Sequence, residues 1–230
     1  MVFLPIKDDN PLRTIKFQYA TLLLIAINLF VFIWQDSLAE AQLVNVAMSG
    51  GLVPNIFLNN ARLPVDFSEL PPMATLLTYM FLHADWWHLG GNMLFLWVFG
   101  DNVEDAMGFV RFILFYLMCG VAAGFAHAYA NPGSEGPLIG ASGAIGGVVA
   151  AYLVLYPRVR MWVLAFGRIP LKIPAYLMVG AWIAFQVFQV YVQDNSDTAW
   201  WAHIGGFFAG FVLVFIFRRP GQQVFMNTPE

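Results

Sequence analysis

Six long apolar segments constrain the fold of this chain more than any other feature of its sequence. Five of them are close to the roughly 20 residues that an α-helix needs to cross a hydrocarbon core of about 30 Å, and the fourth is shorter. They cover residues 15–34, 88–107, 109–130, 142–156, 173–192 and 199–217. The pattern predicts an all-α polytopic membrane protein whose six helices form a transmembrane bundle.

The shortage of charge supports the same conclusion. Of the 230 residues, 60% are hydrophobic and only 11% are charged, whereas soluble domains carry about 25% charged residues. So few charges cannot cover a water-facing surface. Because neither a soluble domain nor a repeat is evident, residues 1–230 are predicted to form a single membrane domain. The proline-broken segment 35–87 is predicted to be a long first loop, partly embedded in the membrane interface.

The basic residues predict the orientation of the bundle. Ten of the 11 Lys and Arg residues precede the first segment, follow the second, separate the fourth from the fifth, or follow the sixth. Six spans place all ten on one side of the membrane, and Arg62 lies on the other. Because loops rich in Lys and Arg remain in the cytoplasm, both termini are predicted to be cytoplasmic.

Two polar residues lie at the same predicted depth in this bundle. Ser142 is 16 residues before Arg158, and His203 is 15 residues before Arg218. At 1.5 Å per residue they lie about 24 Å and about 22 Å above the cytoplasmic boundary. Polar groups at this depth are costly and usually functional.

Small residues recur every four positions beside both polar residues. Such stripes let two helix backbones approach closely in a membrane. If the stripes face each other, the serine and the histidine reach hydrogen-bonding distance, and an imidazole can activate a serine nucleophile. The alternative is that the glycines only pack helices and that both polar side chains bond to nearby backbone. The stripes consist of Gly143, Gly147 and Ala151 in the fourth segment and Ala202, Gly206 and Gly210 in the sixth.

A third polar cluster lies near the outer end of the second segment. His88 and Asn92 are one helical turn apart and share a face. Acyl transfer needs donors aimed at a developing oxyanion, and the Asn92 amide, the His88 imidazole and the Ser142 backbone N–H could supply them.

A metal site is the competing interpretation of the histidines. His83, Asp85, His88 and His203 could together bind zinc, but the sequence has no HExxH motif or other tight ligand spacing. We therefore predict no metal and no cofactor. His127 has no polar companion in the sequence and is interpreted as structural.

Three motifs carry a resemblance to a known family. "HADWWHLGGNM", "GASGAIGG" and "AHIGGFFAG" lie on the second, fourth and sixth segments. In this order they resemble the rhomboid intramembrane serine proteases, and most closely their minimal six-span bacterial form. The resemblance implies a catalytic dyad of Ser142 and His203, with His88, Asn92 and the backbone of Ser142 as the oxyanion hole.

The resemblance also implies supporting residues, substrates and a location. The substrates would be transmembrane segments of single-span membrane proteins, cleaved near their outer end, with the lipid bilayer and no nucleic acid as the other partner. A lateral gate would lie between the second and fifth segments, and the expected location is the plasma membrane of a prokaryote. Glu104 matches an acid with a structural role. The supporting residues are Gly140, Gly143, His83 and Gly206, and the gate candidates, chosen by depth and size, are Phe95, Leu96, Trp182 and Phe185.

The chain departs from the family pattern at two places. A Trp-Arg pair common in the first loop would fall near Ala74 and Thr75, where neither residue occurs. Some relatives have a tyrosine four residues after the serine that stacks on the histidine, and here that position is Gly146. We therefore expect Trp200 or Trp201 to orient the histidine.

Two other functions remain as alternatives. One is a catalytically inactive rhomboid-like protein that binds membrane clients, although the four polar residues of the site are all retained. The other is a small transporter or channel, which would need charged residues along a path through the membrane midplane.

Overall fold

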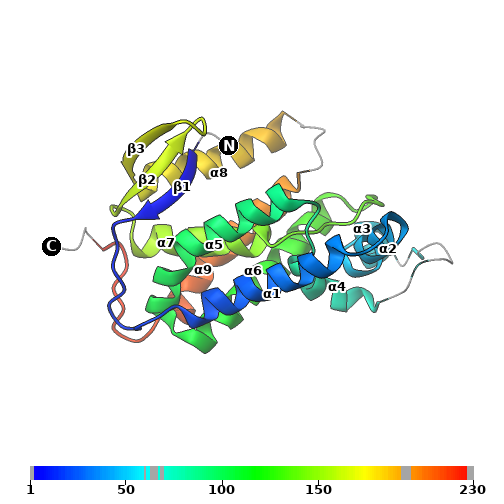
Figure 1. The fold of residues 1–230 in the computed structure, drawn as a ribbon, viewed down its shortest axis with the longest axis horizontal. Coiled ribbons are helices and arrows are strands. Elements are labelled where there is room, and N and C mark those ends of the chain that lie inside the picture. The colour runs from blue at the N-terminus through cyan, green and yellow to red at the C-terminus, as the bar shows by residue number, and fades with distance from the viewer. Residues whose placement is uncertain (1–2, 60, 63–66, 68–69, 193–197, 227–230) are drawn as a thin grey trace.

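Six helices occupy the six predicted segments (Figure 1). The computed structural model describes residues 3–59, 61–62, 67, 70–192 and 198–226. The helices are α1 (Tyr19–Asp36), α5 (Trp86–Met107), α6 (Phe109–Ala130), α7 (Ser142–Leu155), α8 (Ala175–Tyr191) and α9 (Trp200–Phe217). Among the described residues, α1, α6 and α9 are long and apolar enough to cross a membrane, and α7 and α8 are shorter apolar helices. The fold is thus mostly helical and has the character of a membrane protein.

Helix α5 is long, but polar residues reduce its hydropathy. His88 and Asn92 lie near its N-terminal end, and Asp101, Glu104 and Asp105 lie near its C-terminal end. Its middle is apolar and largely buried. The helix therefore combines a packed centre with polar groups at both ends.

The prediction of an all-α fold is wrong in one respect, because the structure contains a three-stranded antiparallel sheet. Its strands are β1 (Phe3–Asp8), β2 (Arg160–Ala165) and β3 (Ile169–Pro174), in the order β1-β2-β3. Phe166 and Gly167, both with positive φ, form the turn between β2 and β3. Strand β3 includes Ile173, where the fifth helix was expected to begin. Helix α8 therefore begins two residues later, at Ala175.

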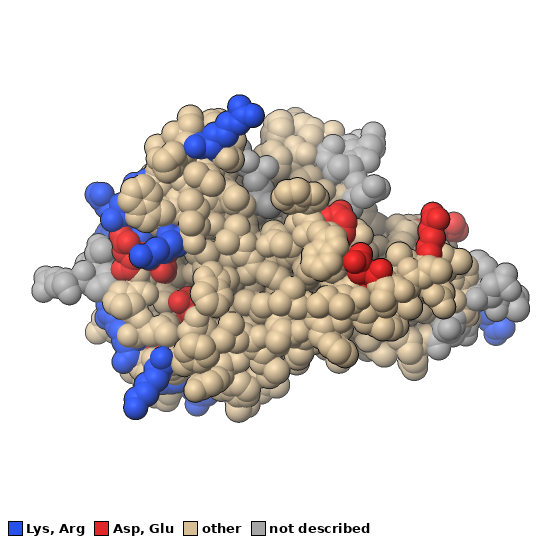
Figure 2. Space-filling model, viewed as in Figure 1, with Lys and Arg blue, Asp and Glu red and all other residues tan. Residues whose placement is uncertain are grey.

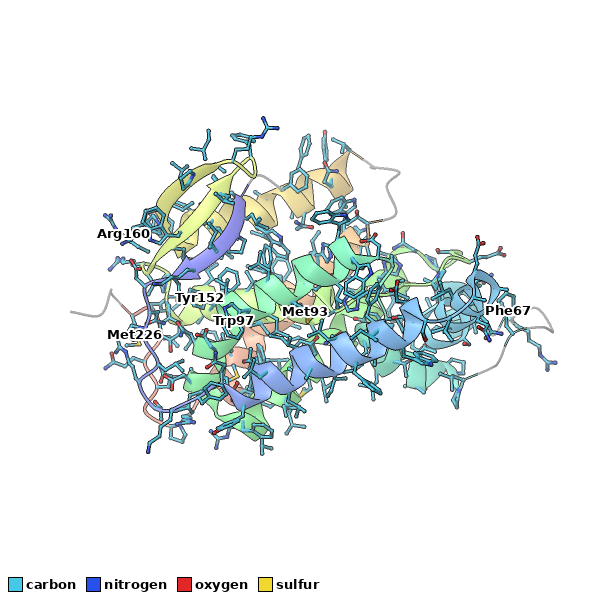
Figure 3. All side chains as sticks on the ribbon, viewed as in Figure 1. Phe67, Met93, Trp97, Tyr152, Arg160 and Met226 are labelled. Carbon is cyan, nitrogen blue, oxygen red and sulfur yellow. The ribbon has the colours of Figure 1, made fainter. Side chains whose placement is uncertain are left out.

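The first loop forms short helices at the end of the bundle opposite the sheet (Figure 1). They are α2 (Glu40–Gly50), α3 (Pro54–Asn59), α4 (Pro72–Thr78) and the single 3-10 turn η1 (Tyr79–Phe81). Residues 60, 63–66, 68 and 69 of the predicted loop lie outside the described residues. Figure 3 shows the same two ends of the molecule. Phe67 lies near the end with the first loop, and Arg160 and Met226 lie near the end with the sheet.

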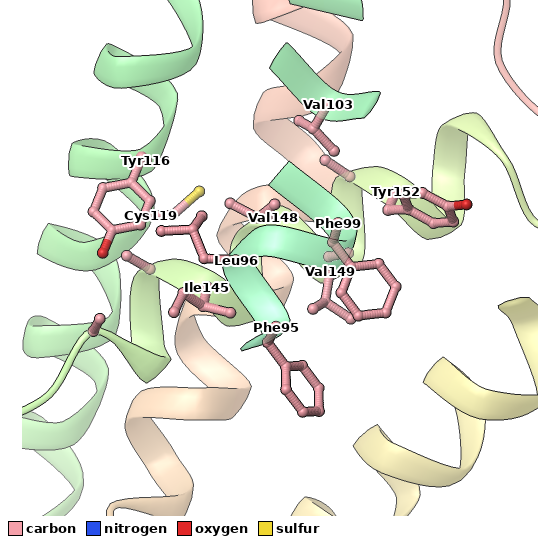
Figure 4. Packing of buried hydrophobic residues seen from close by; sticks show 14 of the residues in the cluster. Phe95, Leu96, Phe99, Val103, Tyr116, Cys119, Ile145, Val148, Val149 and Tyr152 are labelled. Atoms are coloured by element: carbon pink, nitrogen blue, oxygen red, sulfur yellow. The ribbon is translucent and has the colours of Figure 1, made fainter. Parts of the chain in front are cut away.

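Helix α7 lies at the centre of the core. All of its residues are buried except Ser142 and Leu153. Figure 4 shows Ile145, Val148 and Val149 of α7 among side chains of α5 and α6. A helix that is buried all round has no face left for a charged residue, which explains why residues 142–155 carry none.

Glycines permit a backbone-to-backbone contact between α7 and α9. A Cβ atom on Gly206 would overlap the carbonyl of Gly143, and one on Gly210 would overlap the carbonyl of Gly147. The predicted facing of the two small-residue stripes is therefore confirmed.

The acids at the C-terminal end of α5 bind the backbone just before α1 and in its first turn. Glu104 accepts hydrogen bonds from the backbone N–H groups of Ala20 (2.9 Å) and Thr21 (2.8 Å) and from the Thr21 hydroxyl. Asp105 accepts from the backbone N–H groups of Thr14 and Ile15. A carboxylate at a helix N-terminus satisfies donors that have no partner within the helix. Glu104 therefore caps α1, the kind of structural role that the resemblance implied.

Candidate active site

Ser142 and His203 meet where α7 and α9 are closest. Ser142 is the first residue of α7, and His203 lies in the first turn of α9. The distance between His203 Nε2 and Ser142 Oγ is 2.8 Å, and both residues are half-buried. This is the contact that a nucleophile and its general base require.

The glycine contacts explain how two helices bring these side chains together. Gly143 follows the serine directly, and a Cβ atom there would lie 3.3 Å from the hydroxyl oxygen of Tyr79 and 3.4 Å from the carbonyl oxygen of Ala202. Gly206 is one turn beyond the histidine and touches the backbone of Gly143. Larger residues at these positions would separate the helices and, with them, the two polar side chains.

The second nitrogen of the histidine has a partner that the sequence analysis missed. His203 Nδ1 lies 2.7 Å from Oε1 of Gln186 in α8. Gln186 Nε2 in turn donates to the carbonyl oxygen of Trp182 at 3.2 Å. Gln186 is only 2% exposed. A buried amide within an apolar segment was the available signal, because such groups are costly in a membrane unless they have a role.

Aromatic rings enclose the histidine on two sides. Trp200 stands edge-on to the imidazole, with the ring centroids 6.0 Å apart, as one of the two predicted options requires. Trp182 lies at the same distance in a tilted arrangement, and its ring approaches the space beside Gly146. Trp201 is 41% exposed. The position that a tyrosine fills in some relatives is thus approached here by a tryptophan from α8.

Gly140 shapes the turn before the serine. Its φ of +121° is a conformation that favours glycine. A Cβ atom on Gly140 would also lie 2.7 Å from Nε2 of His88, so the imidazole packs directly over this glycine. The backbone N–H of Ala84 faces His88 Nδ1 at 3.4 Å, which favours the tautomer whose proton is on Nε2. That proton then points toward the turn that carries Ser142.

Asn92 provides a second donor on the same face of α5. The residue is 7% exposed, and its Nδ2 has no hydrogen-bond partner among the described residues. Buried amide donors normally have partners, so one without a partner calls for an explanation. A ligand oxygen in the site would provide the missing acceptor.

His83 lies behind His88. The two imidazole centroids are 5.1 Å apart, and Gln35 binds the backbone of His83 through both of its amide atoms. Burial, and secondarily the neighbouring His88, lowers the pKa of His83 to about 4. His83 is therefore neutral near pH 7. Its uncharged ring packs against His88 and supports the position of that side chain.

All four gate candidates lie on α5 or α8, and two of them meet across the boundary between these helices. Phe95 and Trp182 face each other with their ring centroids 6.5 Å apart, and Phe185 stands edge-on to Trp200 at 5.7 Å. Leu96 is fully buried in the core and points toward α7, away from the side to which Phe95 points (Figure 4). Leu96 therefore lies apart from the contact between Phe95 and Trp182, and its role in a gate stays a prediction.

The residues of the metal alternative do not form a ligand cluster. In the described part of the chain, no three His, Cys, Asp or Glu side chains lie close enough to share a metal ion. His203 instead uses its two ring nitrogens to contact Ser142 and Gln186.

Comparison with known proteins identifies the family. The family model for the rhomboid domain matches residues 72–220, a range that contains α5 to α9 and all three sequence motifs. Rhomboid protein 1, mitochondrial, of Saccharomyces cerevisiae is 30% identical over 139 residues, which is 56% of this chain and 38% of that protein. RHOMBOID-like protein 6, mitochondrial, of Arabidopsis thaliana is 31% identical over 165 residues, 67% of this chain and 48% of that protein.

A mammalian relative matches a shorter region. The presenilin-associated rhomboid-like protein, mitochondrial, of Mus musculus is 34% identical over 88 residues, which is 37% of this chain and 23% of that protein. The chain thus spans less than half the length of each of these three relatives. The family match, by contrast, covers more than half of the chain together with its three motifs, and the chain belongs to the rhomboid family.

Proposed function

We propose that this protein is an intramembrane serine endopeptidase that uses Ser142 and His203 as a catalytic dyad. The observation that carries the proposal is the 2.8 Å contact between His203 Nε2 and Ser142 Oγ. Membership of the rhomboid family supports it, because members of this family are generally serine proteases of the membrane.

The geometry suits acyl transfer. His203 Nε2 accepts the proton of Ser142 as Oγ attacks the carbonyl carbon of the scissile bond. The resulting oxyanion accepts hydrogen bonds from the Asn92 amide, from Nε2–H of His88 and from the backbone N–H of Ser142. The imidazolium then gives its proton to the leaving amine. In the second half of the reaction the same imidazole activates a water molecule, which releases the acyl group from Ser142.

The surroundings of the site suit a transmembrane substrate. The side chains at the boundary between α5 and α8, Phe95 and Trp182, are apolar and aromatic. We propose that a single-span membrane protein enters there from the lipid bilayer and unwinds near its outer end. Unwinding is necessary because the backbone of a helix shields its own peptide bonds from in-line attack.

The distribution of charge supports an orientation for the protein. Most Lys and Arg residues in the view of Figure 2 gather at the end of the bundle that carries the sheet. This end would face the cytoplasm of a prokaryote, with the protein in the plasma membrane and with both termini inside. The relatives named above carry mitochondrial names, so the location in a plasma membrane needs a direct test. Labelling of accessible positions of the protein in intact cells provides that test.

The test of the activity uses the purified protein in lipid vesicles. A fluorescent fluorophosphonate should label the wild type, and Ser142→Ala should abolish both labelling and cleavage of a single-span substrate. His203→Ala should do the same, and the double variant should lose little more than either single variant, because the pair acts as a unit. Ser37→Ala, which changes an exposed serine in the turn after α1, serves as the control.

Two outcomes would contradict the proposal. Labelling that persists in Ser142→Ala would place the nucleophile elsewhere. A folded wild type that takes no probe and cleaves no substrate would instead favour the inactive, client-binding alternative.

A further inference from the structure

We infer that Gln186 is a positioning residue that fixes the tautomer and the orientation of His203 through its side-chain oxygen. The inference rests on the proposed function, since it assigns the group that prepares the general base. In many serine hydrolases a carboxylate holds the far nitrogen of the histidine. Here the corresponding contact is made by a neutral amide from a different helix, α8.

The orientation of the Gln186 amide follows from its second contact. Its nitrogen and oxygen atoms have similar shapes, so their hydrogen-bond partners must distinguish them. One end of the amide lies 3.2 Å from the carbonyl oxygen of Trp182, which can only accept a hydrogen bond. The NH₂ group must therefore face Trp182, and Oε1 must face His203.

The tautomer of His203 follows in turn. Gln186 Oε1 can only accept, and it lies 2.7 Å from His203 Nδ1, so Nδ1 must carry the proton. The lone pair of a neutral imidazole is then on Nε2, which lies 2.8 Å from Ser142 Oγ. A chain of three hydrogen bonds thus prepares Nε2 to accept the serine proton.

Burial makes this arrangement specific. Gln186 is 2% exposed, and an amide in such a place is costly unless its polar atoms have partners. Both of its polar atoms are partnered, one by His203 and one by the backbone of its own helix. Among the described residues, Ser142 and Gln186 are the hydrogen-bond partners of the His203 ring. The role of orienting the ring by hydrogen bonding therefore falls to Gln186.

A neutral acceptor suits this environment better than a carboxylate. A buried carboxylate would need a fixed positive partner to offset its loss of hydration. The amide fixes the tautomer without that cost. It also stabilises the imidazolium less than a carboxylate does, so orientation of the ring is its main contribution.

The experiment compares two glutamines of α8. Gln186→Leu removes the acceptor and keeps a similar size, whereas Gln189→Leu makes the same change at a half-buried position one turn away. Gln186→Glu keeps an acceptor oxygen toward His203 in either protonation state. Each variant is assayed in vesicles with the single-span substrate for kcat and KM, and its thermal unfolding is recorded to confirm the fold.

We expect kcat of Gln186→Leu to fall by about 10–100-fold with little change in KM, because loss of one buried hydrogen bond leaves the tautomer unconstrained. Gln189→Leu should match the wild type, and Gln186→Glu should recover most of the lost kcat. Equal losses in the two leucine variants, or an unchanged kcat in Gln186→Leu, would overturn the inference.

A spectroscopic measurement separates this inference from the proposed function. Protein labelled with ¹⁵N-histidine reports directly which ring nitrogen carries the proton, and His203→Ala identifies the His203 signal. The wild type should show the Nδ1–H form, and Gln186→Leu should show a mixture with the Nε2–H form. This readout does not depend on turnover, so an inactive wild type would refute the proposed function and still test Gln186. An unchanged tautomer in Gln186→Leu would refute the role of Gln186 even in an active enzyme.

Discussion

Helix α9 carries His203 and helix α8 contacts it through Gln186, but the two helices are attached to the bundle in different ways. Helix α9, which carries the histidine, meets α7 backbone against backbone at Gly206 and Gly210, where no Cβ atom fits. Helix α8, which carries Gln186, has open space beside Gly180, where a Cβ atom would meet no neighbouring element within 4 Å. The proposed nucleophile and general base are thus held by main-chain packing, whereas Gln186, which we infer to orient the base, is held by side chains.

The burial pattern of α8 makes the contrast sharper. Its buried residues are Ala175, Met178 and Val179 near the N-terminal end, and Gln186 in the C-terminal half. The other contacts around Gln186 include the rings of Trp182 and Phe185. Side-chain contacts of this kind can break and re-form, whereas two backbones in contact cannot separate without loss of the site. A fixed dyad can therefore coexist with a boundary that opens to a substrate.

The largest effect should come from placing a methyl group in the tight contact. Gly206→Ala would drive a Cβ atom into the carbonyl of Gly143, and overpacking of this kind typically costs about 1–3 kcal/mol or more. We expect loss of fluorophosphonate labelling and a clear drop in the unfolding temperature. Gly180→Ala should leave labelling unchanged and be neutral or stabilising by up to about 1 kcal/mol, because alanine favours the helix. Similar behaviour of the two variants would remove the proposed difference between α9 and α8.

A smaller effect should come from two neighbouring residues of α5 that are both buried but pack toward different helices, Phe95 toward α8 and Leu96 toward α7. Phe95→Ala loosens the boundary with α8, so cleavage of a single-span substrate should accelerate by a few fold while cleavage of a short soluble peptide stays constant. Leu96→Ala instead creates a cavity in the core, which typically costs about 2–5 kcal/mol, and should slow both reactions. Rates for both substrates are measured in the same vesicles. Equal acceleration of the two substrates by Phe95→Ala would point to entry from the outer surface.

The smallest effect should appear in the sheet that leads into α8. Burial raises the pKa of Asp8 in β1 to about 6, although its hydrogen bond from the Tyr152 hydroxyl opposes the shift. The folded state therefore holds this proton more tightly than the unfolded state. The resulting stability is fully present below about pH 4 and is lost as the pH rises through about 6, by about 1–3 kcal/mol at most.

Hydrogen exchange of the β1 amides, corrected for intrinsic rates, measures this effect. The opening free energy of β1 should fall between pH 5 and pH 7 in the wild type and should stay nearly constant in Asp8→Asn. Asp9→Asn, which removes a partly exposed ion pair with Lys172, should keep the dependence of the wild type. A pH dependence that survives in Asp8→Asn would assign the effect to another group.

Much of the helical layout and the meeting of Ser142 with His203 could be predicted from the sequence. Hydropathy locates the helices because each contains an apolar run, although α7 and α8 are short and α5 has polar ends. The spacing of the small residues indicates which faces approach. The sheet was missed because β1 pairs with residues more than 150 positions away, a contact that no local pattern indicates.

What could not be predicted within the site has a different cause. Depth along a helix can be counted from the sequence, but direction around the helix depends on packing, which is why Leu96 was grouped with Phe95. Gln186 was missed because an amide among apolar residues gives no sign of which helix it faces. Its partner lies 17 residues further along the chain, in a different helix.

The pairing of β1 with β2 also sets an order of events during synthesis. At about 5–20 residues per second, Ala165 emerges from the ribosome roughly 8–30 s after its partner Phe3. During this interval β1 has no strand to pair with, while α1, α5, α6 and α7 are already made. Completion of the sheet is then followed directly by α8, since Pro174 and Ala175 are consecutive residues. Helix α8, which contacts His203, is thus synthesised only after all three strands, which makes the site one of the last features of the molecule to be assembled.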